Sequence, residues 1–467
     1  MSQSSSDRIL AALRDWIASA PAGARLPSTR ALVAQFEASP VTVQKALKTL
    51  INAGAIEARP GIGTFVRTVR AARPNDYGWQ TAALGAPQFQ GASSLTALRT
   101  TPNNVIALHS GYPDKELLPA RLVRAAFSRA ARSEVAVQRS PTTGLPELQA
   151  WFSAELGALT PAGVTPPADR DVVVLPGSQS GLSSLFRALV GAGRPMLIES
   201  PSYWGAMLAA AQVGVKLVPI PSGPHGPDAA ELDRAFAQTG ARAFYAQPNF
   251  ANPTGGQWSA ELSDRVLEIV REHGAFLIED DWAHDFGIAA PPTPIAARDD
   301  SGHVVYIRSL TKSVSPAVRI AGLIARGPAL DRIVADTQAQ SMYVSGALQA
   351  VALDVVTQPG WGTHLRSLRQ QLADRRDLLV AGLREHAPTA HIEAIPRGGL
   401  NLWVRLPDDT NVAALARDCE ARGVMIAAGD AWFPAEPTGR YLRLNYSGPN
   451  PGAFPEAARV IGEALGA

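Results

Sequence analysis

The first 70 residues carry apolar side chains at a spacing that predicts three short helices. Residues 7–20 place one apolar stripe on a helix, and a stretch containing Pro and Gly then ends the periodicity. Ser28 is suited to cap a second helix, and Ser39 followed by Pro40 predicts the start of a third. Gly54 lies where that third helix should end.

A hairpin is expected after these helices. The segments 56–59 and 63–67 flank a Pro60–Gly61 turn, a pattern that predicts two short strands. Three helices and a hairpin in this order indicate a winged helix-turn-helix, whose recognition helix enters the major groove of DNA. Other small α+β domains show the same order of elements, so the pattern alone leaves both interpretations open.

From residue 105 onward, short apolar runs alternate with amphipathic stretches of helical length. The runs predict strands at 171–175, 195–199, 216–220, 243–246, 275–279 and 304–307. Strands that alternate with helices indicate an α/β body with a mostly parallel sheet. Ligands of such sheets bind beyond the carboxyl ends of the strands, so the residues that follow each strand are the candidates for chemistry.

The segment between head and body, residues 71–104, lacks sustained periodicity and contains several Pro, Gly and Asn residues. We interpret it as a linker with one short helix near residues 79–84. The expected domains are therefore 1–70, the linker 71–104, and 105–467.

The two ends of the chain differ in charge. Residues 1–70 hold nine Lys or Arg against four Asp or Glu, whereas the remainder of the chain is slightly acidic. A basic head favours a polyanionic partner such as nucleic acid. A net charge of +5 over 70 residues also occurs on ordinary protein surfaces, so charge alone does not decide the partner.

Length and composition exclude several classes of protein. The 467 residues are 46% hydrophobic and 18% charged, which excludes a disordered chain and suffices for a large core. No apolar run reaches the roughly 18 residues of a membrane-spanning helix, and the polar N-terminus lacks the apolar core of a signal peptide. Cys419 is the only cysteine, which excludes an intrachain disulfide and a cysteine-based zinc site. We expect a cytoplasmic protein without membrane contact and without a metal.

The residues that follow the predicted strands offer a varied set of polar and aromatic groups. In chain order they are Gly177, Ser178, Gln179, Tyr203, Asn252, Asp280, Ser309, Lys312 and Arg319. Each one alone is compatible with a purely structural role. Together they match the groups of pyridoxal phosphate (PLP): a phosphate, a flat ring, a phenolic oxygen, a ring nitrogen and an aldehyde.

We predict a PLP site in which each residue has one task. Lys312 would bond to the aldehyde, and Asp280 would keep the ring nitrogen protonated, because a nearby negative charge raises the pKa of that nitrogen. Asn252 would hold the phenolic oxygen and Tyr203 would stack on the ring. Lys312, Asp280 and Tyr203 are the candidate catalytic residues. The predicted phosphate ligands are Gly177, Ser178, Gln179, Ser309 and Arg319.

The head resembles the GntR family of bacterial transcription regulators, at Leu26–Arg30, Val41–Val43 and Arg59–Val66. The resemblance implies that DNA is contacted by the second helix, the start of the third helix and the wing. The implied contact residues are Arg30, Ser39, Val41, Thr42, Gln44, Lys45, Gly61 and Gly63. Relatives often carry Arg where Pro40 and Gln44 stand, so a different base preference is expected here.

The body resembles fold-type I, PLP-dependent aminotransferases over about residues 105–467, most clearly at Asn252–Gly255 and from Ser309 to Arg319. The resemblance implies a large domain and a small domain, at about 145–345 and at 105–144 plus 360–467. It also implies that Arg443 binds the carboxylate of a substrate or effector, for which a bidentate guanidinium is suited.

A GntR-like head joined to an aminotransferase-like body resembles the MocR subfamily. This resemblance implies a PLP-dependent transcription regulator that binds double-stranded DNA as a homodimer. It also implies that the body senses a small amine, an amino acid or a B6 vitamer.

Trp282 departs from the family pattern, because relatives usually carry Tyr after the paired acids. An indole cannot act as a phenol, which favours weak or absent transamination and makes Trp282 a candidate effector contact beside Arg443. Two alternatives stay open. One is an active aminotransferase with an accessory head, and the other is a module that binds PLP itself as the effector, without amine chemistry.

Overall fold

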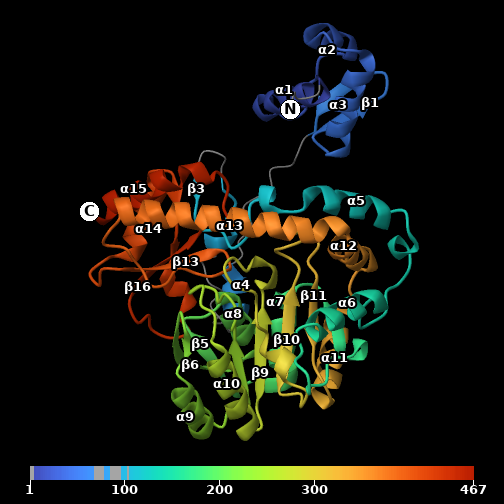
Figure 1. The fold of residues 1–467 in the computed structure, drawn as a ribbon. Helices are drawn as coiled ribbons and strands as arrows, with labels where there is room; N and C mark the ends of the chain where they lie inside the picture. Colours follow the sequence, from blue (N-terminus) through green and yellow to red (C-terminus); the bar gives the residue numbers. More distant parts are fainter. Residues whose placement is uncertain (1–4, 68–77, 85–95, 102–104, 467) are drawn as a thin grey trace. The chain divides into compact units, whose positions relative to one another are not determined.

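The computed structural model describes residues 5–67, 78–84, 96–101 and 105–466 (Figure 1). The chain divides into two compact units, Met1–Gln88 and Phe89–Ala467. The first unit contains the predicted head, and the second contains the predicted α/β body. No helix among the described residues is both long and apolar enough to cross a membrane.

The head consists of three helices and a two-stranded antiparallel hairpin, as the sequence predicts. The elements are α1 (Ser5–Ser19), α2 (Thr29–Phe36), α3 (Pro40–Asn52), β1 (Ile56–Arg59) and β2 (Gly63–Val66). Apolar side chains from all five elements form one core. The short helix expected near residues 79–84 is also present, as α4 (Gly78–Leu84).

Local sequence sets the helix ends in the head. The Ser28 hydroxyl accepts a hydrogen bond from the N–H of Ala31 at 3.2 Å, and the Ser39 hydroxyl accepts one from the N–H of Thr42 at 3.2 Å. These serines therefore cap α2 and α3 as predicted. Gly54 follows the end of α3 with φ +69°, a left-handed conformation that glycine adopts readily and that ends the helix.

The body is built on an eight-stranded sheet in the order β4-β11-β10-β9-β8-β5-β6-β7. The strands are β4 (Val172–Leu175), β5 (Pro195–Ser200), β6 (Lys216–Gly223), β7 (Gly226–Pro227), β8 (Ala243–Ala246), β9 (Phe276–Asp281), β10 (Val304–Ser309) and β11 (Ala321–Ile324). Neighbours from β10 through β6 pair in parallel, whereas β7 and β11 are antiparallel to their neighbours. The predicted mostly parallel sheet is confirmed.

Several details of the sheet differ from the sequence prediction. β7 was not predicted, and β6 and β10 continue three and two residues beyond their predicted ends. β11 was not among the predicted strands, because a four-residue apolar run does not distinguish a strand from a buried helix segment by its periodicity. β9 continues past Glu279 to Asp281, so the paired acids belong to the strand and do not follow it.

Helices cover both faces of this sheet. Alternate residues of β4 point to opposite sides, so Val172 packs in one core and Val173 in the other. The first core includes residues of α6 (Pro146–Gly157), α9 (Ala229–Thr239), α10 (Ala260–Glu272) and α12 (Gly346–Thr357). The second includes residues of α7 (Ser178–Leu185), α8 (Trp204–Val213) and α11 (Pro328–Ser341).

A smaller sheet completes the body, in the order β12-β13-β16-β15. Its strands are β12 (His391–Ile392), β13 (Asn401–Leu406), β15 (Ala427–Ala428) and β16 (Arg440–Asn445). The long helix α13 (Pro359–His386) packs beside α15 (Phe454–Leu465), as Figure 1 shows. Near the start of the body, β3 (Ile106–Ala107) pairs in parallel with β14 (Val424–Met425), which joins sequence-distant segments.

Candidate functional site

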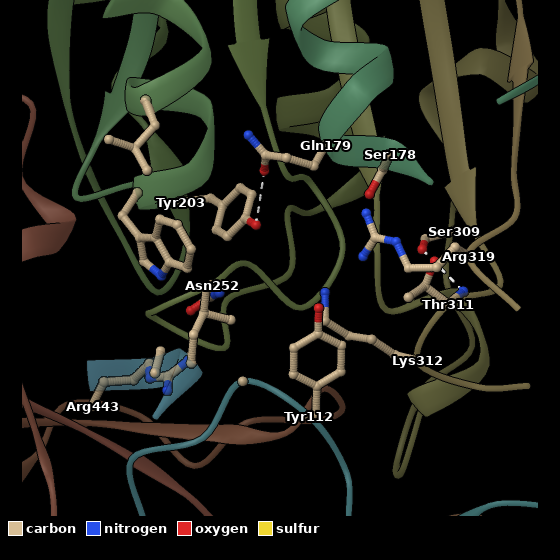
Figure 2. Close-up of a pocket in the computed structure, with 15 residues that line it drawn as sticks. Tyr112, Ser178, Gln179, Tyr203, Asn252, Ser309, Thr311, Lys312, Arg319 and Arg443 are labelled. Carbon is tan, nitrogen blue, oxygen red and sulfur yellow. Dashed lines mark hydrogen bonds between the residues drawn. The ribbon is translucent and has the colours of Figure 1, made fainter. Parts of the chain in front are cut away.

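A cavity of about 270 Å³ lies beyond the carboxyl ends of the parallel strands. Eight of the sequence-predicted residues line it: Ser178, Gln179, Tyr203, Asn252, Ser309, Lys312, Arg319 and Arg443. Figure 2 shows Arg319 beside Ser178 and Ser309 on one side and Arg443 on the other, with Lys312 and Asn252 between them. The fold therefore collects residues separated by up to 265 positions of sequence into one site.

Lys312 lies three residues beyond β10. Its amine is 4.8 Å from the ring centroid of Trp282 and 5.8 Å from that of Tyr112. Burial lowers the pKa of this amine to about 8, even though the carboxylate of Asp280 acts in the opposite direction. An amine with this pKa is partly neutral near physiological pH, and the neutral form is the one that attacks an aldehyde.

Asp280 is buried next to the strand that leads to Lys312, because β9 and β10 pair in parallel with Asp280 opposite Ile307. Its Oδ2 accepts hydrogen bonds from the Tyr245 hydroxyl at 2.7 Å and from Gln247 Nε2 at 2.9 Å. Its Oδ1 is buried and has no hydrogen-bond partner among the described residues. Burial raises the pKa of the carboxyl group, so a positively charged donor at Oδ1 would be strongly favoured.

Asn252 lines the cavity, and its backbone and its side chain form hydrogen bonds with two different residues. Its backbone N–H donates to Gln247 Oε1 at 2.9 Å, and its Oδ1 accepts a hydrogen bond from Trp432 Nε1 at 3.1 Å. Gln247 thus contacts both Asp280 and Asn252 through one amide. The side-chain N–H₂ of Asn252 is left as a donor for a ligand.

The turn into α7 and the approach of Arg319 form one end of the cavity. Gly177 has φ +90°, a conformation that favours glycine, and a Cβ there would lie only 3.0 Å from Arg319 Nη2. The N-terminus of α7 begins at Ser178, and Ser309 lies at the end of β10. Backbone N–H groups, two hydroxyls and a guanidinium are suited to bind a phosphate.

Tyr203 presents its ring to the cavity directly before α8. Its hydroxyl donates to Gln179 Oε1 at 3.1 Å (Figure 2), and Gln179 Nε2 donates to the carbonyl of Gly205 at 2.7 Å. The side chain of Gln179 is therefore engaged in holding the Tyr203 ring. Burial raises the pKa of the Tyr203 hydroxyl, which stays protonated.

Arg443 projects from β16 at the opposite end of the cavity and is fully buried. Its Nη2 donates to the carbonyl oxygens of His109 and Ser110. Its Nε and Nη1 are buried and have no hydrogen-bond partner among the described residues. Burial lowers the pKa of the guanidinium to about 9, so an anion placed against these two donors would be strongly favoured.

Trp282 does not line the cavity. Its side chain is 4% exposed and belongs to the core of the smaller sheet, where it also contacts Phe286. It lies beneath the amine of Lys312 and not on the wall that a ligand would touch.

Several residues of the site were not singled out from the sequence. Tyr112, Thr311 and Leu208 line the cavity, and Tyr245, Gln247 and Trp432 hold the residues that do. Gln247 directly precedes the Pro248–Gly255 stretch that drew attention to Asn252, so its neighbourhood was a usable signal. Trp432 lies 180 residues from Asn252, and no spacing rule connects the two.

The head presents a second candidate site on its surface. Arg30 on α2 and Val41, Gln44 and Lys45 on α3 are all exposed, with Val41 at 75%. The hydroxyls of Ser39 and Thr42 bond to each other at 2.8 Å and so belong to the helix cap. In the wing, Gly61 has φ +75° and Gly63 has φ +144°. Exposed polar side chains at the start of a recognition helix are suited to touch base edges.

Comparison with known proteins identifies both units. Residues 103–461 match the family described as aminotransferase class I and II. The chain belongs to this family. Residues 5–66 match the family described as bacterial regulatory proteins, gntR family. A GntR-type DNA-binding head is thus fused to a body of the class I and II aminotransferase family, the combination that the sequence predicted.

This member of the class I and II aminotransferase family is similar both to a regulatory protein and to aminotransferases, as three examples show. The probable rhizopine catabolism regulatory protein MocR of Rhizobium meliloti is 29% identical over 95% of this chain and 90% of its own. The 2-aminoadipate transaminase of Thermus thermophilus is 28% identical over 82% of this chain and 95% of its own. The crystal structure of LysN, an α-aminoadipate aminotransferase from Thermus thermophilus, has a TM-score of 0.73 at 26% identity and covers 81% of this chain and 95% of its own.

The cofactor of this family is PLP, and LysN is complexed with N-(5'-phosphopyridoxyl)-L-leucine. The residues present here fit that group. The unpaired Oδ1 of Asp280 is suited to a cationic donor such as the protonated ring nitrogen of PLP, and Ser178, Ser309 and Arg319 line the cavity with donors suited to a phosphate.

Proposed function

We propose that this protein is a transcription regulator whose body binds PLP and senses an amino acid through it. One observation carries the proposal. Lys312 lines one cavity together with Arg443, a buried guanidinium with two unpaired nitrogens, and the buried carboxylate of Asp280, which has one unpaired oxygen, acts electrostatically on the Lys312 amine. This arrangement fits a cationic ring nitrogen on one side and an anionic carboxylate on the other.

Each residue around PLP has a proposed task. Lys312 bonds covalently to the cofactor, Asp280 pairs with the ring nitrogen, Asn252 donates to the phenolic oxygen and Tyr203 stacks on the ring. PLP, when bound, supplies an electron sink for bonds at the carbon next to an amine. The phosphate is held by Gly177, Ser178, Ser309, Arg319 and the backbone N–H of Gln179, whose side chain is already engaged by Tyr203.

The proposed effector carries a carboxylate as well as an amine. Arg443 offers two unpaired donors for the carboxylate, and the adjoining wall includes the apolar side chains of Leu98, Trp204 and Leu208. An amino acid therefore fits this cavity better than a simple amine or an unphosphorylated B6 vitamer such as pyridoxal, neither of which supplies the anion that Arg443 lacks.

We further propose that Arg30, Lys45 and the wing hold the DNA backbone while Val41 and Gln44 contact bases. A glutamine pairs with adenine and a valine contacts the methyl group of thymine, so this head is suited to A·T pairs. A homodimer would present two heads to two half-sites, and effector binding would change how the heads span them. The body carries exposed apolar side chains that a partner would cover, among them Val137 and Met342.

An active aminotransferase is the second candidate function. In its favour, Asn252, Lys312 and Arg443 line one cavity, Asp280 is buried with an unpaired carboxylate oxygen, and the Thermus relative is named a transaminase. Against it, Trp282 places an indole beside Lys312 and supplies no phenol to assist proton transfer.

The test follows the visible absorption of the PLP-loaded protein and its operator affinity together while amino acids, amines and B6 vitamers are added. Under the proposal, an amino acid shifts the absorption band without consuming it and changes DNA affinity in the same concentration range. Complete conversion of the cofactor to its pyridoxamine form, with turnover near 1 s⁻¹, would favour the enzyme. A DNA affinity that responds to PLP and to no amino acid would identify PLP as the effector and overturn the proposal.

A further inference from the structure

Trp432 is a buried residue beside the smaller sheet that contacts two residues lining the cavity, Asn252 and Arg443. It ends the short helical turn Gly429–Trp432, which follows β15, and its side chain is 3% exposed. It packs in an aromatic cluster with Trp403, Phe433 and Tyr441. These contacts give the indole a fixed position.

Three contacts connect Trp432 to the proposed PLP and effector sites. Its Nε1–H donates to Asn252 Oδ1 at 3.1 Å, and its backbone carbonyl accepts a hydrogen bond from the N–H of Ser202 at 2.8 Å, one residue before Tyr203. The guanidinium carbon of Arg443 lies 4.8 Å from the Trp432 ring centroid. One residue therefore contacts both the residue proposed to hold the phenolic oxygen and the proposed carboxylate clamp.

The hydrogen bond to Asn252 decides which way its amide points. An indole N–H can only donate, so the atom that receives it must be the amide oxygen. The N–H₂ group of Asn252 is then the group that faces the cavity. Because Gln247 holds only the backbone N–H of Asn252, Trp432 is the side chain that fixes the orientation of the amide.

We propose that Trp432 is a positioning residue that keeps the Asn252 N–H₂ directed at the phenolic oxygen of PLP. This inference rests on the proposed function, because it needs PLP in the cavity. An ionised phenolic oxygen that receives a hydrogen bond holds its negative charge at lower pH. Loss of the indole N–H frees the Asn252 amide to rotate, so the bound cofactor should take up a proton at higher pH.

The experiment is a pH titration of the visible absorption band of PLP-loaded protein. Trp432→Phe keeps an aromatic ring and removes the N–H. We expect the midpoint of the titration of this variant to rise by about 0.5 to 1 pH unit, which corresponds to the free energy of one ordinary hydrogen bond. Trp361→Phe is the matched control, since Trp361 is also buried and stacks on His364 in α13, and its midpoint should equal that of the unsubstituted protein.

A double substitution separates positioning from a general loosening of the site. Asn252→Ala removes the amide, so its midpoint should rise at least as far as that of Trp432→Phe. In the Asn252→Ala background, Trp432→Phe should add less than about 0.2 pH unit, because its partner is gone. Shifts that add fully would overturn the proposal, as would a Trp432→Phe midpoint equal to the unsubstituted one.

Two outcomes keep this inference separate from the proposed function. If the unsubstituted protein shows no visible band with PLP, the proposed function fails and the Trp432 inference fails with it. If the band is present and only the Trp432→Phe shift is missing, the inference alone fails.

Should Trp432→Phe not fold, ¹⁵N-indole NMR of the unsubstituted protein replaces it. One indole N–H resonance must then move on Asn252→Ala, and no movement overturns the proposal.

Discussion

The head and the body of this chain place their functional residues in opposite surroundings. In the head, Arg30, Gln44 and Lys45 are exposed on helices whose ends are set by adjacent serines. In the body, Asp280 and Arg443 are buried with polar atoms that lack a protein partner. The head can therefore act through side chains that water otherwise solvates, whereas the body holds charges whose burial is costly until a ligand binds.

This difference predicts how each region responds to substitution. Replacing an exposed side chain removes only the contact that it makes with its ligand, because no buried polar group loses its partner. A buried charged group is part of a connected network, so its loss also affects the groups that remain. The largest effects are therefore expected in the cavity and the smallest on the head.

Replacing Lys312 by Ala should have the largest effect, because it removes the only amine proposed to bond to the cofactor. We expect complete loss of the visible absorption band after PLP is added and excess PLP is dialysed away. DNA affinity measured on the same protein should stay within about twofold, since the head is a separate unit. Lys216→Ala, which removes an exposed lysine at the start of β6, is the matched control and should keep the band. A band that survives in Lys312→Ala would reject Lys312 as the anchor.

Arg443→Ala should come next, with an effect confined to the effector. Loss of one partner of a buried, hydrogen-bonded charge pair costs about 2 to 5 kcal/mol. The amino acid that shifts the absorption band should therefore bind roughly 30- to 5,000-fold more weakly, whereas PLP alone still binds. Arg405→Ala, on the neighbouring strand β13 and exposed, should leave both affinities unchanged. Unchanged effector affinity in Arg443→Ala would place the carboxylate elsewhere.

The pH dependence of PLP attachment should show the lowered pKa of Lys312. Because the neutral amine is the reactive form and its pKa is about 8, the attachment rate should rise roughly tenfold per unit below pH 8 and level off above it. An exposed lysine would level off near its usual value of about 10.4. Stopped-flow absorbance with the apoprotein measures this rate, and a rate still rising through pH 10 would contradict the burial of this amine.

The same pKa shift predicts the sign of a stability change. Between pH 8 and about 10.4 the unfolded chain binds a proton at this lysine that the folded apoprotein does not. The contribution of Lys312 to the free energy of unfolding should therefore become more favourable as pH rises through that window. Comparison of apoprotein denaturation curves with those of Lys312→Ala isolates this contribution, and a difference that is constant with pH would contradict it.

The smallest effects are expected on the head. Replacing Arg30 and Lys45 together by Ala should weaken operator binding about tenfold and reduce the slope of log affinity against log salt by about two. The absorption band of bound PLP should not change. Arg332→Ala, an exposed substitution on α11 of the body, is the control. A binding curve and salt slope equal to those of the unsubstituted protein would show that these two cations do not touch DNA.

The sequence predicted more of the head than of the cavity, for identifiable reasons. Ser28, Ser39 and Gly54 act on their own helices, so short-range rules located those helix ends. Lys312 and Asn252 follow strands, and the rule for parallel sheets placed both at one edge. Trp282 lay adjacent to the acids in sequence and was expected to face the ligand, whereas its side chain packs in the core beneath Lys312.

By itself, the sequence determined the order of the elements, the parallel character of the large sheet and the residue types that a PLP site needs, because these follow from local periodicity and from strand ends. Only the tertiary structure decided which atoms remain without a partner and which side chains fix the others. The entry of β11 between β4 and β10, the amide of Gln247 shared by Asp280 and Asn252, and the reach of Trp432 to Asn252 all join distant segments. Contacts of this kind depend on how distant segments pack in three dimensions, and the spacing of residues along the chain does not predict that packing.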